Sequence, residues 1–312
     1  MVSENDAGQR LDKFLQKAIE GLPAGLMHKA IRTKNIKINK KRCYRDDRLQ
    51  PGDLVEVYIK DELLPERVDS SDFFSAPSTL SVVYEDENIL LMDKPVGLVV
   101  HEDNDNTQDT LVNRMLHYLY AQGSFDPSKE NSFVPALVNR IDRNTGGLVI
   151  GAKNAAALRI LNQKMKDREI QKTYLCAVHG VPSPKTALLT GFLEKKQELN
   201  RVYITKNKTE NSRSVQTRYT VLKEKNDMAL LSVELLTGRT HQIRAHMASV
   251  GHPLLGDGKY GSNEQNKGLP FKTQALYSHN LRFKFTSDSG ILEYLNGKEF
   301  TVPDVWFLSL FE

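Results

Sequence analysis

Hydrophobic side chains near the N-terminus recur every three or four residues, the spacing that gives a helix one apolar face: Leu11, Phe14, Leu15, Ala18 and Ile19. The stretch Gly21-Leu22-Pro23 ends this helix, and a second short helix is predicted over residues 24–32. Alternating positions then predict strands in "IKIN" (36–39) and "GDLVEVYIK" (52–60). Two helices and a small hairpin make residues 1–60 a first domain, which is small but able to fold.

The pattern changes after residue 60. Residues 61–79, "DELLPERVDSSDFFSAPST", have no clear period, and we interpret them as a linker. From residue 80 to 312 helices are predicted only over 155–166 and 240–251, and short strands dominate: "SVVYED", "NILLMDKP", "PALVNRID", "GLVIGAKN", "KTYLCAVHGV", "SVQTRYTVL", "MALLSVELL" and "YSHNLRFKF". Because many strands follow one another without a helix between them, the second domain is predicted to be mixed α+β.

Composition places the chain among soluble globular proteins. Hydrophobic residues make up 39% and charged residues 26% of the 312, and no apolar run approaches the about 18–20 residues that span a bilayer. The N-terminal "MVSENDAGQRL" is too polar for a secretory signal. The two cysteines, Cys43 and Cys176, lie far apart without metal spacing. We therefore expect reduced thiols and a cytoplasmic protein.

The positive charge is concentrated in the first domain. Residues 1–60 hold 13 Lys and Arg against 8 Asp and Glu, although the whole chain carries only +4. A run without acidic residues supplies most of this excess: Lys29, Arg32, Lys34, Lys37, Lys40, Lys41, Arg42 and Arg45. Such a run indicates a polyanion as partner, and we take the first seven as candidate RNA contacts. The alternative is that these charges only keep a small domain soluble.

Several classes of site are excluded by context. "GDGKYG" (256–261) matches the dinucleotide pattern G-x-G-x-x-G, but no helix opens behind it, so no nucleotide cofactor is expected. His241 and His246 share a predicted helix, where a five-residue spacing turns them about 140° apart, so a metal site is not expected. The chain contains neither a P-loop nor the nucleophile elbow G-x-S-x-G. The sequence thus predicts chemistry without metal or cofactor.

Three segments carry candidate chemistry. "NRIDRNTGG" (139–147) places Asp142 between two arginines, which on motif shape alone also fits a charge-balanced surface loop. In "GRTHQIRAHMASVG" (238–251) Thr240 is the expected N-cap, so Arg239 precedes a helix N-terminus, a poor place for a cation unless an anion binds there. Tyr174, in the strand "QKTYLCAVHG", either packs in the sheet or stacks on a base.

Together these segments resemble the RluA-type RNA pseudouridine synthases. "NRIDRNTGGLVIGAKN" resembles the signature H-R-L-D-x-x-T-S-G of that family, and "QKTYLCAVHG" and "GRTHQIRAHMASVGHPLLGDGKYG" resemble its second and third motifs. The first domain is similar to an S4 RNA-binding domain. The chain departs from the signature at Asn139, Ile141 and Gly146, which stand where the family has His, Leu and Ser. The resemblance implies a mainly antiparallel catalytic sheet behind a small α/β RNA-binding domain.

The resemblance also implies the roles of individual residues. The nucleophile of the family maps to Asp142, its partner arginine to Arg244, and the residue that stacks on uracil to Tyr174. Arg140 corresponds to the arginine that enters the RNA stack when the target nucleotide flips out, and Arg239 would suit a phosphate. Asp142 must be ionised either to attack C1′ of the ribose or to take the 2′ proton, and a nearby guanidinium favours that form.

The expected reaction converts a uridine to pseudouridine in structured RNA, with large-subunit ribosomal RNA as the favoured substrate and transfer RNA as the alternative. A non-catalytic RNA-binding or ribosome-assembly protein is the runner-up, but it would not need Asp142, Tyr174 and Arg244 together. A glycosidase would need a second acid, and none stands in motif context. We expect a monomer without cofactor, bound to RNA and not to a membrane.

Overall fold

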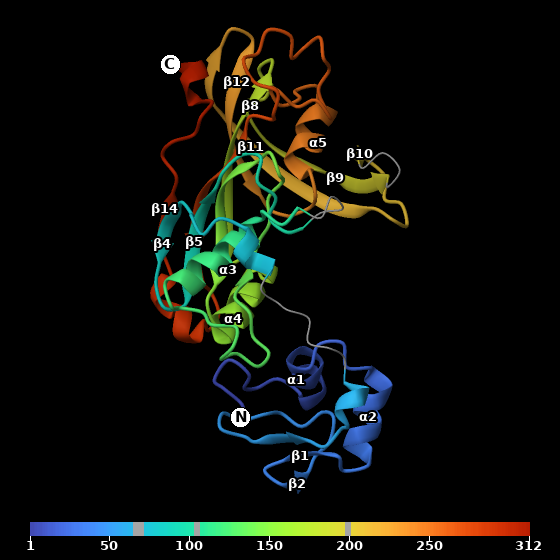
Figure 1. Cartoon of the computed structure of the whole chain (residues 1–312). Coiled ribbons are helices and arrows are strands. Elements are labelled where there is room, and N and C mark those ends of the chain that lie inside the picture. Colours follow the sequence, from blue (N-terminus) through green and yellow to red (C-terminus); the bar gives the residue numbers. More distant parts are fainter. Residues whose placement is uncertain (65–71, 103–106, 197–200) are drawn as a thin grey trace.

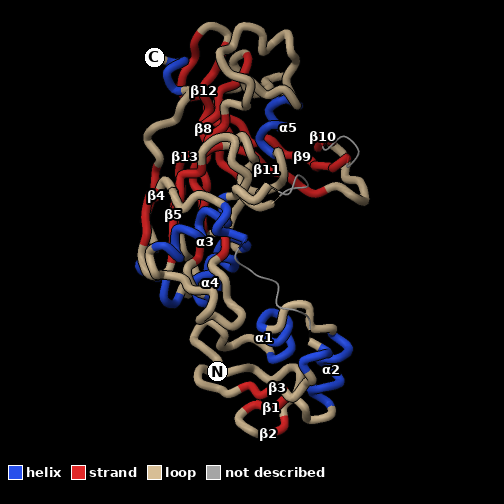
Figure 2. Tube along the Cα trace, viewed as in Figure 1, coloured by secondary structure: helices blue, strands red, loops and turns tan. Residues whose placement is uncertain are grey.

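The computed structural model describes residues 1–64, 72–102, 107–196 and 201–312, and it begins with a small unit at one end of the molecule (Figures 1 and 2). Helices α1 (Leu11–Ala18) and α2 (Ala24–Arg32) pack on a three-stranded sheet in the order β2-β1-β3. The strands are β1 (Ile36–Ile38), β2 (Lys41–Arg42) and β3 (Val55–Val57). The predicted helical stripe forms the core of this unit, which includes the buried residues Leu11, Leu15, Met27, Ile31, Ile36 and Leu49.

Polar contacts join the N-terminal segment to the larger part of the chain. The carboxylate of Asp6 is fully buried and accepts hydrogen bonds from Asn131 Nδ2 and Ser132 Oγ, both at 2.6 Å. Gln9 donates to Ser132 Oγ at 2.7 Å, and Arg159 donates to the carbonyl of Ala7 at 3.0 Å. Hydrogen bonds lower the pKa of Asp6 although burial opposes this. The charged form of this carboxylate is therefore the one that holds the two parts together.

The prediction that residues 61–79 form a linker can be compared with the structure only in part, because residues 65–71 lie outside the described residues. The flanking residues form two 3-10 helices, η1 (Asp61–Leu63) and η2 (Asp72–Ser75). Phe73 in η2 is 3% exposed and packs in the same core as α3 (Leu111–Ala121), a helix that the hydrophobic pattern did not predict. Packing against the larger part thus begins before residue 80.

The larger part is built on one mixed sheet of 11 strands, which confirms the predicted α+β class. The main path runs β10-β9-β11-β12-β8-β13-β7-β5-β4, with β14 paired to β13 and β6 paired to β7. Every recorded pairing is antiparallel except β13 with β7. The strands are β4 (Val82–Glu85), β5 (Ile89–Lys94), β6 (Ala136–Leu137), β7 (Gly146–Ala152), β8 (Ile170–His179), β9 (Thr186–Lys196), β10 (Arg201–Thr205), β11 (Arg213–Lys225), β12 (Met228–Leu235), β13 (Leu276–Phe283) and β14 (Glu299–Thr301).

The two faces of this sheet bury separate cores, because successive side chains of a strand point to opposite faces. On one face Leu90, Met92 and Tyr174 pack with residues of α3 and of α5 (Gln242–Ser249). On the other face Leu91 and Leu175 pack with α4 (Ala155–Lys166) and with η4 (Gly290–Leu295) and η5 (Leu308–Phe311). Both faces of the central strands are covered, which explains their nearly continuous apolar sequences. No helix among the described residues is long and apolar enough to span a bilayer.

Helix α5 begins later than the sequence predicts. His241, and not Thr240, is its N-cap, with φ 54° and ψ 20° in the left-handed region and no side-chain capping bond. Ile243 and Met247 are buried, whereas Val250 at the end of the helix is 41% exposed. The hydrogen bond of Thr237 to Gln242 Oε1 at 2.9 Å fixes the turn before the helix. His241 is thereby turned inward at the helix start.

Candidate active site

A cavity of about 280 Å³ opens where the loop between β6 and β7, strand β8 and the start of α5 meet. All five residues to which the resemblance assigned a role in the second domain line it: Arg140, Asp142, Tyr174, Arg239 and Arg244. Its volume is close to the lower limit of about 300 Å³ for small-molecule pockets. These five residues are spread over about a hundred positions of sequence, so the fold brings them together.

The loop that carries Asp142 is anchored by the side chain of Asn139, which forms hydrogen bonds with β7 as the backbone of a neighbouring strand would. Asn139 Oδ1 accepts a hydrogen bond from the backbone N–H of Ile150 at 2.8 Å, and its Nδ2 donates to the carbonyl of Leu148 at 3.4 Å. These bonds continue the β6–β7 ladder for one more step. The N–H of Thr145 closes the turn on the carbonyl of Asp142 at 3.0 Å. Asn139, which replaces the histidine of the signature, thus fixes the beginning of the loop to β7.

Lys94 holds the same loop through hydrogen bonds to backbone carbonyls. Its side chain is fully buried, and Nζ donates to the carbonyls of Pro95 at 2.9 Å, Leu98 at 2.7 Å and Arg143 at 2.9 Å. Burial lowers the pKa of Lys94 to about 7, against the opposing attraction of Asp142. Three carbonyl acceptors match the three N–H groups of an ammonium ion. Lys94 therefore fixes the carbonyl directly after Asp142.

The two glycines of the loop leave no room for a side chain. A Cβ at Gly146 would lie 2.4 Å from Tyr277 Cε2, and one at Gly147 would lie 2.2 Å from the carbonyl oxygen of Ser278. Gly147 also has a φ of 111°, a conformation that only glycine adopts readily. The serine of the family signature would therefore collide with the ring of Tyr277 at position 146. The tyrosine fills the space that this departure leaves.

Arg244 bridges two carboxylates. Nε and Nη2 donate to Asp257 Oδ2 and Oδ1 at 2.7 and 2.9 Å, and Nη1 donates to Asp142 Oδ2 at 3.1 Å. Asp257 is fully buried, and Arg244 keeps the pKa of this carboxyl below its usual range although burial would raise it. A bidentate pair holds a guanidinium in one orientation. Asp257 thus aims the third donor of Arg244 at Asp142.

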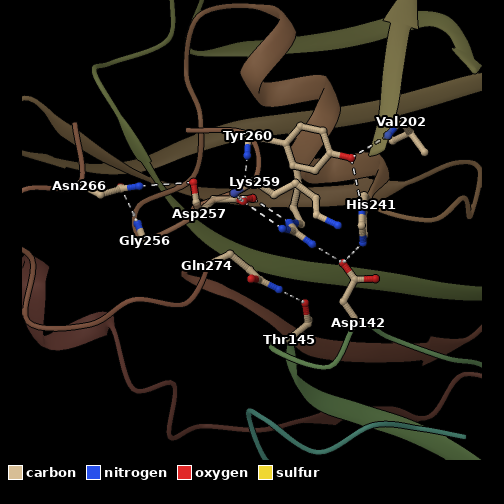
Figure 3. A network of polar contacts seen from close by, with 11 residues as sticks. Asp142, Thr145, Val202, His241, Gly256, Asp257, Lys259, Tyr260, Asn266 and Gln274 are labelled. Carbon is tan, nitrogen blue, oxygen red and sulfur yellow. Dashed lines mark hydrogen bonds and ion pairs between the residues drawn. The ribbon is translucent and has the colours of Figure 1, made fainter. Parts of the chain in front are cut away.

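A second branch of the network approaches Asp142 from His241 (Figure 3). Nε2 of His241 lies 3.8 Å from Asp142 Oδ2, while Nδ1 lies 3.0 Å from the hydroxyl of Tyr260. That hydroxyl also accepts the N–H of Val202 at 3.0 Å. Burial and the charge of Arg244 lower the pKa of His241, against the opposite effect of Asp142. The ring is therefore held neutral beside the carboxylate.

Tyr174 forms a wall of the cavity. Its side chain belongs to the core, with 5% exposure, and yet it lines the opening from β8. Burial raises the pKa of Tyr174 to about 12, so its phenol stays neutral. Lys172, two residues earlier on the strand, lines the same cavity, and burial lowers its pKa. Arg140 and Arg239 are exposed at the mouth.

The basic residues of the first unit lie far from this cavity in sequence and form their own surface. Lys29, Arg32, Lys34, Lys40, Lys41 and Arg42 are exposed and Lys37 is half-buried. The guanidinium of Arg42 lies 5.2 Å from the ring of Tyr44, and Nζ of Lys37 lies 5.3 Å from that of Tyr58. Arg32, Arg42 and Tyr44 also line a hollow of about 390 Å³. Two of the cations on this surface therefore lie next to exposed aromatic rings.

Sequence reasoning assigned no role in the site to Lys94, His241, Asp257 and Tyr260, which hold the loop of Asp142, Arg244 or one another, or to Lys172, which lines the cavity. Asp257 and Tyr260 stand in "GDGKYG", which was rejected as a nucleotide motif and matched to the end of the third family motif without a role for either residue. An acid directly after a glycine turn, in a segment that follows an arginine-bearing helix, was the available signal. Among residues 1–64, 72–102, 107–196 and 201–312, no three His, Cys, Asp or Glu side chains cluster in a way that would hold a metal ion.

Comparison with known proteins identifies the class to which this fold and site belong. Residues 88–249 match the family model of RNA pseudouridylate synthase. Ribosomal large subunit pseudouridine synthase C of Escherichia coli (strain K12) is 31% identical over 300 residues, which cover 91% of this chain and 87% of that protein. The uncharacterized RNA pseudouridine synthase YlyB of Bacillus subtilis (strain 168) is 30% identical over 94% of this chain and 91% of its own length.

A solved structure, human RNA Pseudouridylate Synthase Domain Containing 1, shares the fold with a TM-score of 0.58 at 22% identity, over 78% of this chain and 89% of that one. The sequence matches show more than the fold. This chain belongs to the RluA-type RNA pseudouridine synthases, and it is an isomerase that acts on RNA. The class predicted from the motifs is therefore confirmed.

Replacing Lys94 by Met should destabilise the protein and slow catalysis without weakening RNA binding. The carbonyl of the buried Leu98 loses its donor, whereas Pro95 and Arg143 are exposed and the carbonyl of Arg143 still accepts the N–H of Gly97. One unsatisfied buried group costs about 1–3 kcal/mol, so we expect a loss of that size in the free energy of unfolding. The loop of Asp142 then relaxes. Urea unfolding and single-turnover rates at saturating enzyme would measure the two effects.

Lys153→Met is the matched control for that variant. Lys153 is 11% exposed and pairs with Glu85 at 2.7 Å, away from the cavity. The Lys153→Met variant should be less stable than the wild type but should keep its turnover rate. Equal loss of turnover in both variants would mean that Lys94 acts through stability alone.

Proposed function

We propose that this enzyme forms pseudouridine in large-subunit ribosomal RNA, with Asp142 as the catalytic group and the first unit as an RNA anchor. The observation that carries the catalytic assignment is the contact of Asp142 Oδ2 with Arg244 Nη1 at 3.1 Å on the floor of the cavity. Among the described residues that line this cavity, Asp142 is the only acid. One ionised carboxylate held by one guanidinium is what attack at C1′, or removal of the 2′ proton, requires.

The two oxygens of Asp142 have different surroundings. Oδ2 accepts from Arg244 and faces His241, whereas no described residue donates a hydrogen bond to Oδ1. The bidentate contact with Asp257 keeps Arg244 from following a moving substrate. Oδ1 is therefore free to meet the ribose while Oδ2 stays anchored. This arrangement orients the reacting group before the RNA arrives.

The walls of the cavity suit a pyrimidine ring. Tyr174, Ile243 and Leu276 provide apolar surface, and Thr240 and Lys172 provide donors at the edge. A flipped base gains stacking and edge hydrogen bonds in such a pocket, which offset the few kcal/mol lost on unstacking. We assign Tyr174 the stacking role because its neutral phenol lines the same cavity as Asp142.

The two arginines at the mouth would handle the rest of the RNA. Arg140 lies two residues before Asp142 and is exposed, so its guanidinium plane is available to stack in the helix in place of the extruded base. Arg239, exposed just before α5, would bind a backbone phosphate near the helix start. These two roles require side chains that are not already tied down inside the protein. Both residues meet that requirement by their exposure.

Ribosomal RNA is proposed over transfer RNA on two grounds. The relative from Escherichia coli is named for the large ribosomal subunit and aligns with 91% of this chain. The first unit presents Arg32, Arg42 and Tyr44 around a hollow of about 390 Å³, which would hold structured RNA outside the catalytic cavity. Such an RNA places the enzyme in the cytoplasm. Ribosome assembly without catalysis is not favoured, because the chain belongs to an enzyme family.

The test is to map pseudouridines in total RNA from a strain that lacks this protein. Loss of one or more sites in large-subunit ribosomal RNA, restored by the wild-type gene and not by Asp142→Asn, is the expected result. Loss confined to transfer RNA would overturn the substrate and keep the reaction. An unchanged pseudouridine map would overturn both.

Neutralising the basic surface of the first unit should weaken RNA binding and flatten its salt dependence. Lys34, Lys40 and Lys41 are exposed, and substitution by Gln removes their charges while the contacts of Asp6 stay in place. Each lost phosphate contact lowers the log–log slope of affinity against salt by about 0.7 for single strands. We expect a decrease of up to about 2 units for the triple variant.

The control for this variant removes the same charge elsewhere. Lys223, Lys225 and Lys284 are exposed residues of the larger part, and their Gln variant should keep the slope of the wild type. Filter-binding titrations over a salt series give both slopes. Equal slopes for the two triple variants would remove the anchor from the proposal and leave the catalytic assignment unaffected.

A further inference from the structure

The hydrogen bonds of Tyr260 determine which nitrogen of His241 carries a proton. The phenol oxygen accepts the N–H of Val202, and its only other hydrogen-bond partner among the described residues is His241 Nδ1, both at 3.0 Å. A buried O–H needs an acceptor, so the hydroxyl donates to Nδ1. A neutral imidazole that accepts at Nδ1 carries its hydrogen at Nε2. That N–H is directed toward the cavity and Asp142 (Figure 3).

This Nε2–H group has no acceptor at hydrogen-bond distance among the described residues. Asp142 Oδ2 is 3.8 Å away, too far for a hydrogen bond, and it is already bound by Arg244. The backbone of His241 is held at a φ of 54°, in a region that side-chain-bearing residues seldom occupy. Such a conformation persists only where the surroundings fix it, and it often marks a functional site. The ring is therefore fixed with one free donor beside the catalytic carboxylate.

We propose that His241 Nε2–H donates a hydrogen bond to the 2′-hydroxyl oxygen of the target ribose, and thereby makes the enzyme selective for RNA over DNA. The inference rests on the proposed role of Asp142. A carboxylate that attacks C1′, or takes the proton on C2′, has the 2′-oxygen within two bonds of the reacting atom. A donor 3.8 Å from that carboxylate reaches this oxygen when the ribose enters. The 2′-hydroxyl is the group by which proteins distinguish RNA from DNA.

The opposite role, in which His241 accepts a proton from the substrate, is disfavoured by the same contacts. Nε2 already holds a hydrogen, so a second proton would make the ring a cation. Burial, Arg244 and Lys259 all oppose this cation, whereas Asp142 and Asp257 favour it. The net effect is a lowered pKa of His241, so burial and the two cations outweigh the two carboxylates. The histidine is thus a donor at neutral pH.

The test compares two enzymes on two substrates. A short synthetic stem-loop spanning the uridine found by pseudouridine mapping is made with either uridine or 2′-deoxyuridine at the target. Wild type should convert the ribose form about tenfold faster or more, the size of one hydrogen bond. His241→Phe keeps a flat ring without the donor, and its two rates should be nearly equal. An unchanged ribose-to-deoxyribose ratio in His241→Phe would refute the proposal.

Further variants separate this role from a structural one. The amide of His241→Gln offers an N–H near the position of Nε2 and should restore part of the ratio. Tyr260→Phe removes the bond that fixes the tautomer and should lower the ratio without abolishing it. Thermal unfolding identifies variants that fail to fold. If His241→Phe turns over too slowly, affinities for the two stem-loops in an Asp142→Asn background give the same comparison.

A failure of this test is distinct from a failure of the proposed function. If mapping places the uridine in transfer RNA, the proposed substrate falls, but the stem-loop is then taken from that RNA and the ratio is measured in the same way. If wild type shows no preference for the ribose form on its own uridine, the role of His241 falls while the isomerase activity stands.

Discussion

Asp142→Asn is expected to abolish pseudouridine formation while it leaves the fold and the RNA affinity nearly unchanged. Asparagine has the same shape, and its side-chain oxygen can still accept the hydrogen bond of Arg244. It cannot attack C1′ or take a proton. Because no second acid lines the cavity within the described part of the chain, we expect a loss of about 10⁴-fold or more, the size seen when an enzyme loses its nucleophile.

Single-turnover conversion of an RNA fragment that contains the mapped uridine measures this loss, and filter binding measures affinity. Asp109→Asn is a suitable control, because Asp109 pairs with Arg114 away from the cavity and is 44% exposed. It should retain wild-type rates. Conversion by Asp142→Asn within tenfold of the wild-type rate would show that another group performs the chemistry.

Arg244→Met should damage both stability and activity. The substitution leaves the fully buried Asp257 without its bidentate partner, although the backbone N–H groups of Lys259 and Tyr260 still donate to it at 2.9 and 3.1 Å. Breaking a buried pair from one side costs about 3–5 kcal/mol, and we expect the lower value because of these remaining bonds. In the same step Asp142 loses the only direct guanidinium contact that it makes with a described residue. We expect its turnover to fall about 10²-fold or more, as when one stabilising donor is removed.

A second substitution separates the two effects. Arg244→Met combined with Asp257→Asn removes the uncompensated charge as well, so most of the free energy of unfolding should return. Activity should not return, since Asp142 still lacks its partner. Urea unfolding and turnover of both variants test this directly. Recovery of activity together with stability would mean that Arg244 serves only to hold Asp257.

Hydrophobic spacing was sufficient to predict the helices that have apolar residues on only one face. The second helix and the helix at 155–166 have the bounds of α2 and α4, because each presents a regular apolar stripe between clear end signals. Helix α3 was missed even though Thr110 caps it by accepting from the N–H of Asn113. The pairing of β9 with β10 was missed because apolar and polar residues do not alternate along β9, "TALLTGFLEKK", and β10 is only five residues long.

The candidate site was predictable to the extent that it resides in short motifs. Asp142, Tyr174 and Arg244 were each found by their local sequence, and the cavity contains all three. The sequence could not predict the contacts between residues of different motifs. The bidentate grip of Asp257 and the bond from Tyr260 to His241 depend on where a loop folds back onto α5. Spacing along the chain carries no information about such contacts.

The close packing of Tyr277 on Gly146 restricts how this sequence can change over time. A Cβ at position 146 would meet the ring at 2.4 Å, so serine cannot be installed alone, although the family signature has it there. A smaller residue at 277 must come first, and the reverse path must restore glycine before the tyrosine. Consensus design applied to position 146 by itself would therefore lose stability, whereas exchanging both positions together would be tolerated. Gly146, at the end of the loop that carries Asp142, and Tyr277, on a strand more than a hundred residues away, therefore form a matched pair.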